Sequence, residues 1–251
     1  MRRFFILLNR EIGHYFHQPL AYVVLFFFLF LTGLNFYMAV SVLNHDTSRV
    51  SLVEAFFNGI LLWFPLILCF PLLTMRLFSE EYKTGTIETL MTAPVGDASV
   101  VLSKFVGAFV FYVVLWLPSV LYFAIFTWIT GQRSADSFAA YLGAYSMLLL
   151  IGMFYLAIGC LASALTKHQI IAAIVAFALI CGLFFLHLLS FFMPSASPML
   201  REITYYFSTL EHMADFSHGV FDTRPVVFYL SLTAFTLFVT FHIFQYRRWR
   251  S

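Results

Sequence analysis

Histidine and methionine are the side chains in this sequence that could bind a metal ion or carry a proton. His187 and His242 each lie within a long apolar run, where a polar group is costly and often functional. Methionine thioethers and histidine imidazoles, which could bind copper, are scattered late in the chain. They are Met193, Met199, His212, Met213 and His218. They have no fixed spacing, so we expect no metal site. Interfacial hydrogen bonding is the simpler interpretation of the two histidines.

The sequence contains no motif of a hydrolase or of an ATPase. HExxH, GxSxG and the phosphate-binding loop with its lysine are all missing. Three acids that could act as a general acid or base, Glu80, Glu81 and Glu88, cluster in one polar segment, where docking or loop capping is the better account. We therefore expect that this chain is not an enzyme and binds no cofactor itself.

The elements that carry these residues are predicted to be membrane-spanning helices. The chain is 62% apolar and 10% charged, with a mean hydropathy of +0.90, whereas soluble domains carry about 25% charged residues. Because roughly 20 helical residues cross the hydrocarbon, the apolar runs predict six spans, over residues 20–42, 55–76, 101–129, 138–165, 169–193 and 225–246. The net charge of +2 gives nucleic-acid binding no support.

An amphipathic helix is predicted over residues 1–17. Apolar side chains recur on one face at helical spacing, while arginine and histidine occupy the other. Such a helix lies flat on the inner leaflet with its basic side among the headgroups. Arg2 and Arg3 superficially resemble the start of a signal sequence, but Asn9 and Arg10 interrupt the apolar run and no small-residue cleavage site follows.

Residues 76–104 form the longest charged interruption between apolar runs. Ile87, Leu90 and Met91 are spaced so that they share one face of a short helix, and Pro94 ends that helix. A short amphipathic helix beneath two spans suits insertion into the groove of a partner. An ordinary polar loop between two spans is the alternative, and composition does not exclude it.

This stretch resembles the segment that follows the second span in ABC-2 type exporter permeases. The residues that carry the resemblance are Arg76, Glu80, Glu81, Gly85, Thr86, Glu88, Leu90, Pro94 and Lys104. In that family the segment is a coupling helix resting on a cytosolic ATPase. The resemblance therefore implies ATPase contacts at Glu81, Thr86, Ile87, Glu88, Leu90, Met91 and Pro94.

The resemblance also implies an overall organisation. It predicts an all-α membrane protein with a single domain over residues 1–251, an elbow helix at 1–17, a coupling loop at 77–100 and two short external re-entrant helices within 197–219. The implied partners are two cytosolic ABC ATPase subunits, which hold ATP and magnesium, and a second permease chain, identical or not. The implied location is the cytoplasmic membrane of a bacterium or archaeon.

Lysine and arginine predict how the chain is oriented, because they favour the cytoplasmic side of short loops. With the N-terminus inside, ten of the 14 basic residues are cytoplasmic. The four on the outer side are Arg49, Arg133, Arg201 and Arg224. Both termini are thus predicted to be cytoplasmic, which places residues 76–104 where an ATPase could reach them.

Two short helices are predicted between the last two spans. Ser197 can cap the first, with Pro198 at its first position. Ser208 and Glu211 form a capping box for the second, and Gly219 suits its end. By the resemblance these helices form an external gate, with residues Pro198, Glu202, Tyr205, Glu211 and Gly219. A solvent-exposed loop with ordinary caps is the alternative.

The leading hypothesis is an exporter permease driven by a separate ATPase. Residues 218–222 add a finer resemblance, to the subgroup related to gliding-motility and nitrous-oxide-reductase maturation permeases. Two alternatives are a membrane-embedded enzyme acting on lipid or peptide, with His187 and His242 as its candidate residues, and a non-transporting anchor for an ATPase. Small residues along the fourth and fifth spans, Gly143, Gly152 and Gly159 among them, predict close helix packing.

Overall fold

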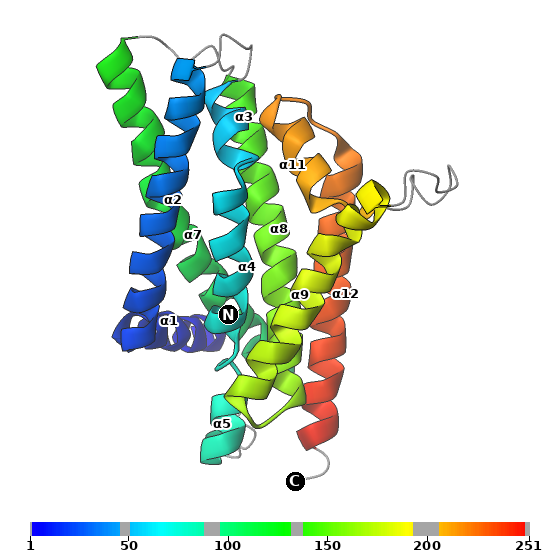
Figure 1. Ribbon diagram of the computed structural model, residues 1–251. Coiled ribbons are helices and arrows are strands. Elements are labelled where there is room, and N and C mark those ends of the chain that lie inside the picture. The colour runs from blue at the N-terminus through cyan, green and yellow to red at the C-terminus, as the bar shows by residue number, and fades with distance from the viewer. Residues whose placement is uncertain (1, 46–50, 88–95, 132–137, 193–205, 249–251) are drawn as a thin grey trace.

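The computed structural model describes residues 2–45, 51–87, 96–131, 138–192 and 206–248, and within these ranges all regular structure is helical. The helices are α1 (Arg2–His17), α2 (Pro19–His45), α3 (Leu52–Phe57), α4 (Ile60–Thr74), α5 (Ser79–Thr84), α7 (Asp97–Thr130), α8 (Phe138–Leu165), α9 (Gln169–Phe192), α11 (Thr209–Ser217) and α12 (Thr223–Arg248). The long helices run alongside one another, α1 lies across one end of the bundle near α5, and α3 and α11 lie at the opposite end (Figure 1). We name these the α5 end and the α11 end.

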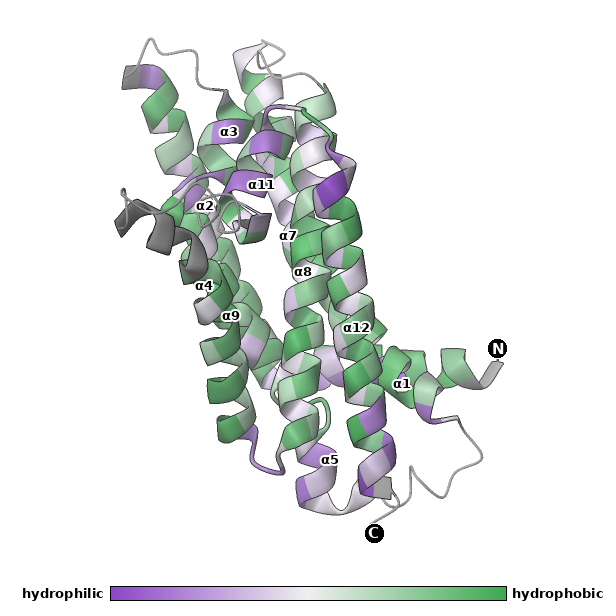
Figure 2. Ribbon diagram, turned by 90° about the vertical axis from the view of Figure 1, so that its right-hand side faces the viewer, coloured by the Kyte–Doolittle hydropathy of each residue, from purple (hydrophilic) through white to green (hydrophobic). Residues whose placement is uncertain are grey.

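Within the described residues, five helical segments are long and apolar enough to cross a membrane. They are Pro19–Asn44, Ile60–Thr84, Asp97–Thr130, Phe138–Leu165 and Thr223–Arg247. The fifth predicted span, 169–193, corresponds to α9, whose apolar stretch within the described side chains is shorter, Gln169–Phe185. Hydrophobic residues cover the length of the long helices, while hydrophilic residues gather around α5 and α11 (Figure 2). The all-helical prediction is confirmed with five spans, and the sixth stays a prediction.

The second span, predicted over residues 55–76, consists of two helices in the structure. The chain forms the short helix α3, breaks at Asn58 and Gly59, and starts α4 at Ile60. The break is stabilised from α2, where the Asn35 side-chain amide donates a hydrogen bond of 2.8 Å to the Phe56 carbonyl oxygen. A Cβ at position 59 would overlap the Asn35 carboxamide, so the close approach requires glycine. Ser51 caps α3 by accepting from the Glu54 amide at 3.1 Å.

Helix α8 forms the centre of the bundle. It contacts α7, α9, α11 and α12, and it is the most buried of the five candidate spans. Its glycines make this possible: a Cβ on Gly152 would overlap the Tyr112 ring, one on Gly159 would overlap the Thr74 side chain, and one on Gly143 would overlap a backbone oxygen of α11. The prediction that small residues mark close helix packing is confirmed along α8.

Candidate functional site

The segment predicted to couple to an ATPase begins with a tight turn after α4 and continues into α5. Helix α5 ends at Gly85, whose φ of 74° lies in the left-handed region. Of the predicted contact residues, Glu81 is half-buried, Thr86 is exposed and Ile87 is buried. Since Ile87 packs inside this chain, its side chain is not presented to solvent. Four others, Glu88, Leu90, Met91 and Pro94, lie outside the described residues, and the docking role stays a prediction.

Ser163 of α8 holds the turn before α5. Its hydroxyl oxygen accepts hydrogen bonds from the backbone amides of Phe78 at 3.0 Å and Ser79 at 3.2 Å. The same hydroxyl lies 3.2 Å from the Met75 carbonyl oxygen, to which it donates. The first amides of a helix have no partner within the helix, so one buried serine both satisfies the start of α5 and ties it to the central helix.

Aromatic contacts fasten α5 to the last helix. Phe78 is fully buried, and its ring centroid lies 5.8 Å from that of Phe244 in α12. The Arg247 guanidinium stands 4.6 Å from the centroid of the Tyr82 ring, a cation–π geometry. Arg247 also donates a hydrogen bond of 2.5 Å to the Leu165 carbonyl oxygen at the end of α8. The end of α12 is therefore joined both to α5 and to α8.

A four-residue ion cluster links α5 to α1 and α7. Lys104 Nζ lies 2.8 Å from Glu81 Oε1 and 3.3 Å from Glu11 Oε1, and Arg10 Nη2 lies 2.9 Å from Glu11 Oε1 and 3.3 Å from Glu81 Oε1. The Lys104 side chain is only 3% exposed. A buried charge is tolerated when it is paired, and here two cations face two carboxylates. We call Arg10, Glu11, Glu81 and Lys104 the ion cluster.

The electrostatics of the ion cluster favour ionised Glu11. Burial by itself raises the pKa of this carboxyl, but the charge of Lys104 and the hydrogen bond and charge of Arg10 outweigh it, so the pKa lies below its usual value. Gly107 in α7 permits the approach of α1, because a Cβ there would lie 3.0 Å from Glu11 Cβ. No local pattern in the sequence singles out Glu11, because its partner Lys104 lies 93 residues later in the chain.

We expect Gly85→Ala to lower the free energy of unfolding by about 1–2 kcal/mol, because an L side chain is disfavoured at positive φ. Among the described residues, no atom lies within 4 Å of the added Cβ, so the cost is conformational and not steric. Thermal unfolding in detergent measures the loss. Gly85→Asn is the matched control: asparagine tolerates the left-handed region, so it should lose less than alanine. Equal losses for both variants would refute this explanation.

At the α11 end, Ser208 caps the short helix as predicted, accepting a hydrogen bond of 3.2 Å from the Glu211 amide. Gly219 follows the helix with a φ of 79°. Tyr155 in α8 and Thr209 share a hydrogen bond of 3.0 Å between their hydroxyls, which fixes the start of α11 to the central helix. The other predicted gate residues, Pro198, Glu202 and Tyr205, lie outside the described residues, and the gate stays a prediction.

Contacts from α11 to α3 complete this end. The Asn58 side-chain amide lies 3.4 Å from the Ser217 hydroxyl oxygen, and His218 Nε2 lies 3.6 Å from Glu54 Oε1. These pairs join the break in the second span to the predicted external gate. About 160 residues separate the two regions in the sequence, so no local pattern connects them.

His212 is a buried titratable group on α11. Its Nδ1 lies 3.2 Å from the Tyr229 hydroxyl, and its ring packs edge-on against Phe228 and Tyr229 of α12. Burial lowers the pKa of this imidazole below 6.5, although Asp215 and Asp222 act in the opposite direction. The folded protein therefore favours the neutral ring.

We expect α11 to dock less tightly as the pH falls. Since the pKa is lower in the folded than in the unfolded state, the stability that neutral His212 contributes is present above pH 6.5 and is lost as the pH falls through the lowered value. Hydrogen exchange of the α11 amides at pH 7.5 and pH 5 measures the change. His212→Asn should abolish most of the pH dependence; an unchanged dependence in that variant would assign the effect to other groups.

The other residues that could bind a metal ion or carry a proton include His242 and His187. Among the described residues, no group of three or more His, Cys, Asp or Glu side chains could hold a metal ion. His242 is exposed, and its Nδ1 lies 3.0 Å from the Phe238 carbonyl oxygen of its own helix. The position of the His187 side chain lies outside the described set.

Comparison with known proteins identifies the family. Residues 17–184 match the model of the ABC-2 family transporter proteins. That range is more than half of the chain and includes α2, the turn before α5, the ion-cluster residues Glu81 and Lys104, and the central helix α8. The chain belongs to the ABC-2 transporter family and is a multi-pass membrane protein. A search of curated proteins found no matching relative.

Proposed function

We propose that this chain is the permease subunit of an ABC-2 type exporter, which moves a substrate across the cytoplasmic membrane with ATP hydrolysed by separate cytosolic subunits. The observation that carries the proposal is the family match over residues 17–184 together with five candidate spans. Two ATPase subunits bind ATP and magnesium, and a second permease chain completes the translocation path. The finer subgroup related to gliding-motility and nitrous-oxide-reductase maturation permeases belongs to the same proposal.

The α5 end faces the cytosol in this proposal. Arg10, Arg76, Lys83, Lys104 and Arg247 all belong to this end, which accords with the preference of basic residues for the cytoplasmic side. The amphipathic helix α1 lies across the same end, a placement suited to the inner membrane surface (Figure 1). Both termini are then cytoplasmic.

The attachments of α5 give the proposed coupling a physical route. A push on α5 reaches α8 through Ser163, α1 and α7 through the ion cluster, and α12 through Tyr82 and Arg247. Packed interfaces of this kind move as rigid units between discrete arrangements. Closure of the ATPase subunits would thus rock the helices as a body and shift the equilibrium toward an outward-open state. At the other end α11 and the residues before it act as the external gate.

The two alternatives differ in how far the structure bears on them. A membrane-embedded enzyme would need convergent side chains within the spans, whereas His242 is exposed and bonds to its own helix. A non-transporting anchor would share every contact of α5 described above. Only transport distinguishes an anchor from a permease.

Co-purification tests the proposal. The chain is expressed with its ATPase partner, extracted in mild detergent, and the ATPase activity of the complex is measured. Met91→Asp, in the predicted docking helix, should reduce ATPase recovery and activity at least tenfold, because a charge in an apolar groove costs several kcal/mol. The matched control is Val220→Asp, which places the same charge on an exposed apolar residue at the α11 end.

The result that contradicts the proposal is a chain that purifies without any ATPase, or a Met91→Asp complex that behaves like the Val220→Asp complex. Transport is then measured in vesicles that contain the whole complex and candidate amphipathic cargo. ATP-dependent accumulation separates a permease from an anchor.

A further inference from the structure

A large pocket lies at the α5 end between α1, the start of α2, the end of α4 and α5. Its volume is about 910 Å³. Side chains of both charges line it. The cations are Arg10, Arg76 and Lys104, and the carboxylates are Glu11, Glu80 and Glu81. The lining also includes apolar groups from the first turns of α2. Such a pocket fits a ligand that carries a positive group, a negative group and an apolar part.

Three polar atoms in this lining are unsatisfied. Arg76 Nε, Glu80 Oε2 and Glu81 Oε2 are buried and have no hydrogen-bond partner among the described residues. The Arg76 guanidinium and the Glu80 carboxylate form no ion pair within the described part of the chain. Buried polar groups are nearly always hydrogen-bonded, so each exception calls for an explanation. A cationic donor and two carboxylate oxygens together match a ligand that carries a phosphate beside an ammonium group.

A second hollow adjoins the first. It has a volume of about 360 Å³, and α2, α4 and α9 line it almost entirely with apolar atoms. Leu20, Val24 and Leu72 line both hollows, so the polar pocket and the apolar one lie side by side. Phe27 and Phe177 are among the side chains further along. This surface belongs to helices of the membrane-embedded bundle, where hydrocarbon chains are the available apolar ligands.

We propose that the two hollows together bind one bilayer phospholipid whose headgroup carries both a phosphate and a primary ammonium. The phosphate pairs with Arg76, the ammonium donates to Glu80 and Glu81, and an acyl chain occupies the apolar hollow. A purely anionic headgroup could pair with Arg76 but would leave the Glu80 carboxylate without a cation, because Arg10 and Lys104 already pair with Glu11 and Glu81. A quaternary ammonium has no N–H to donate to the unsatisfied carboxylate oxygens. Arginine is well suited to the phosphate because it donates through two parallel hydrogen bonds.

The position of the pocket agrees with this ligand. Helix α1 forms one wall and lies across the end of the bundle, as an interfacial helix does at headgroup depth (Figure 1). The Tyr15 hydroxyl donates a hydrogen bond of 2.9 Å to the Leu73 carbonyl oxygen, which fixes this wall to α4. The bound lipid would touch α1, α4 and α5 at once. The inference goes beyond the proposed function, since it holds whatever cargo the complex moves and whichever partner it has.

Native mass spectrometry of the purified chain tests the proposal. The probes are phosphatidylethanolamine, phosphatidylcholine and phosphatidylglycerol, each titrated against the protein in detergent, and the soluble headgroup glycerophosphoethanolamine. Phosphatidylethanolamine should bind with the highest affinity, at least fivefold above the other two lipids. The soluble headgroup should bind at least a hundredfold more weakly, because it has no chain for the apolar hollow.

Two variants test the phosphate and the ammonium contacts of the headgroup separately. Arg76→Gln should weaken phosphatidylethanolamine binding about tenfold, and Glu80→Gln should remove its advantage over phosphatidylglycerol. The matched controls are Lys83→Gln, an exposed charge on α5 that does not line the pocket, and Glu54→Gln at the α11 end. Both controls should bind like the original chain. Thermal unfolding of each variant verifies that it is folded. If Arg76→Gln does not fold, the half-buried Glu80→Gln variant still tests the proposal.

Two results would overturn the proposal. One is that the three lipids bind with equal affinity and that the variants bind like their controls. This would show that the pocket does not distinguish one headgroup from another. The other is a soluble headgroup that binds as tightly as the lipid, which would leave the apolar hollow without a role.

Discussion

Replacing Lys104 with methionine is expected to lower the free energy of unfolding by roughly 3–5 kcal/mol, the usual cost of removing one partner of a buried ion pair. Methionine keeps most of the side-chain volume but leaves Glu11 and Glu81 with Arg10 as their cation, and Arg10 is half-exposed. Thermal unfolding in detergent should show the loss as a drop of about 10 °C, because 1 kcal/mol corresponds to about 2–4 °C in a chain of this size.

Two further variants show whether the loss arises from the unpaired carboxylates. Lys83→Met removes the same charge at an exposed position and should change the unfolding temperature by less than about 2 °C. The double variant Lys104→Met/Glu11→Gln restores charge balance in the ion cluster and should recover a large part of the loss. If the double variant is no more stable than Lys104→Met, charge pairing is not what holds α1 and α5 to α7.

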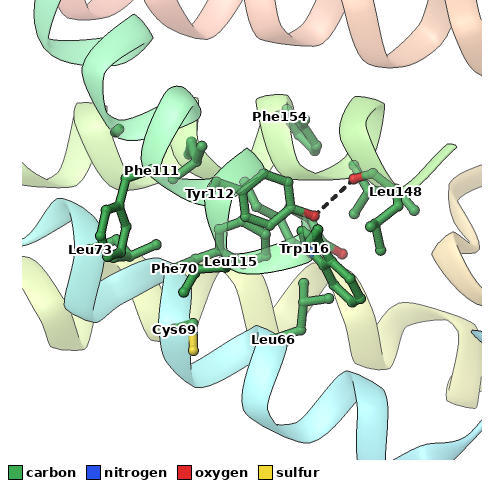
Figure 3. Close-up of a cluster of buried hydrophobic side chains, with 14 of the residues drawn as sticks. Leu66, Cys69, Phe70, Leu73, Phe111, Tyr112, Leu115, Trp116, Leu148 and Phe154 are labelled. Atoms are coloured by element: carbon green, nitrogen blue, oxygen red, sulfur yellow. Dashed lines mark hydrogen bonds between the residues drawn. The ribbon is translucent and has the colours of Figure 1, made fainter. Parts of the chain in front are cut away.

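Gly152→Val is expected to prevent normal packing of α7 on α8. The Cβ alone would overlap the Tyr112 ring, and that ring cannot easily move. The Tyr112 hydroxyl donates a hydrogen bond of 3.0 Å to the Leu148 carbonyl oxygen, and its ring lies 5.3 Å from that of Phe70 (Figure 3). Overpacking of a dense core costs about 1–3 kcal/mol for added methylenes; an overlap with a fixed ring should reach or exceed the upper value. We expect low yield and a drop of about 10 °C or more in unfolding temperature.

The control for this variant is Gly182→Val in α9. It introduces the same side chain into a helix, at a position where no atom of the described residues lies within 4 Å of the added Cβ. It should therefore unfold close to the original chain. Adding Tyr112→Ala to Gly152→Val should make room for the valine and restore part of the yield. If Gly182→Val is as damaging as Gly152→Val, helix propensity and not packing explains the effect.

Apolar length predicts the helices of this chain well but does not reveal where a helix breaks. Five predicted spans agree with the structure because a run of about 20 apolar residues has few alternatives in a membrane. The break at Asn58 and Gly59 was missed because its stabilising partner is Asn35 of another helix. A polar group that is satisfied across the bundle leaves no periodic signal in the local sequence.

Local rules also predicted parts of the candidate sites. Ser208 caps α11 and Gly219 follows its end, as predicted, because caps and turns depend on neighbouring residues. The ion cluster was not predicted, since its members come from three helices and charge alone does not identify a partner. Burial of Ile87 could not be anticipated for the same reason: the amphipathic spacing indicated an apolar face, but not that Ile87 would pack within its own chain.

In the proposed function the α5 end faces the cytosol, where a separate ATPase can bind it. Labelling of single cysteines in intact cells with a membrane-impermeant thiol reagent tests this most directly, in a background where Cys69, Cys160 and Cys181 are replaced. Thr86→Cys and Val220→Cys are compared, since both positions are exposed and they lie at opposite ends of the bundle. We predict that residue 220 is labelled in intact cells and residue 86 only after the membrane is opened. Labelling of residue 86 in intact cells would contradict the account, because no cytosolic ATPase could reach that end.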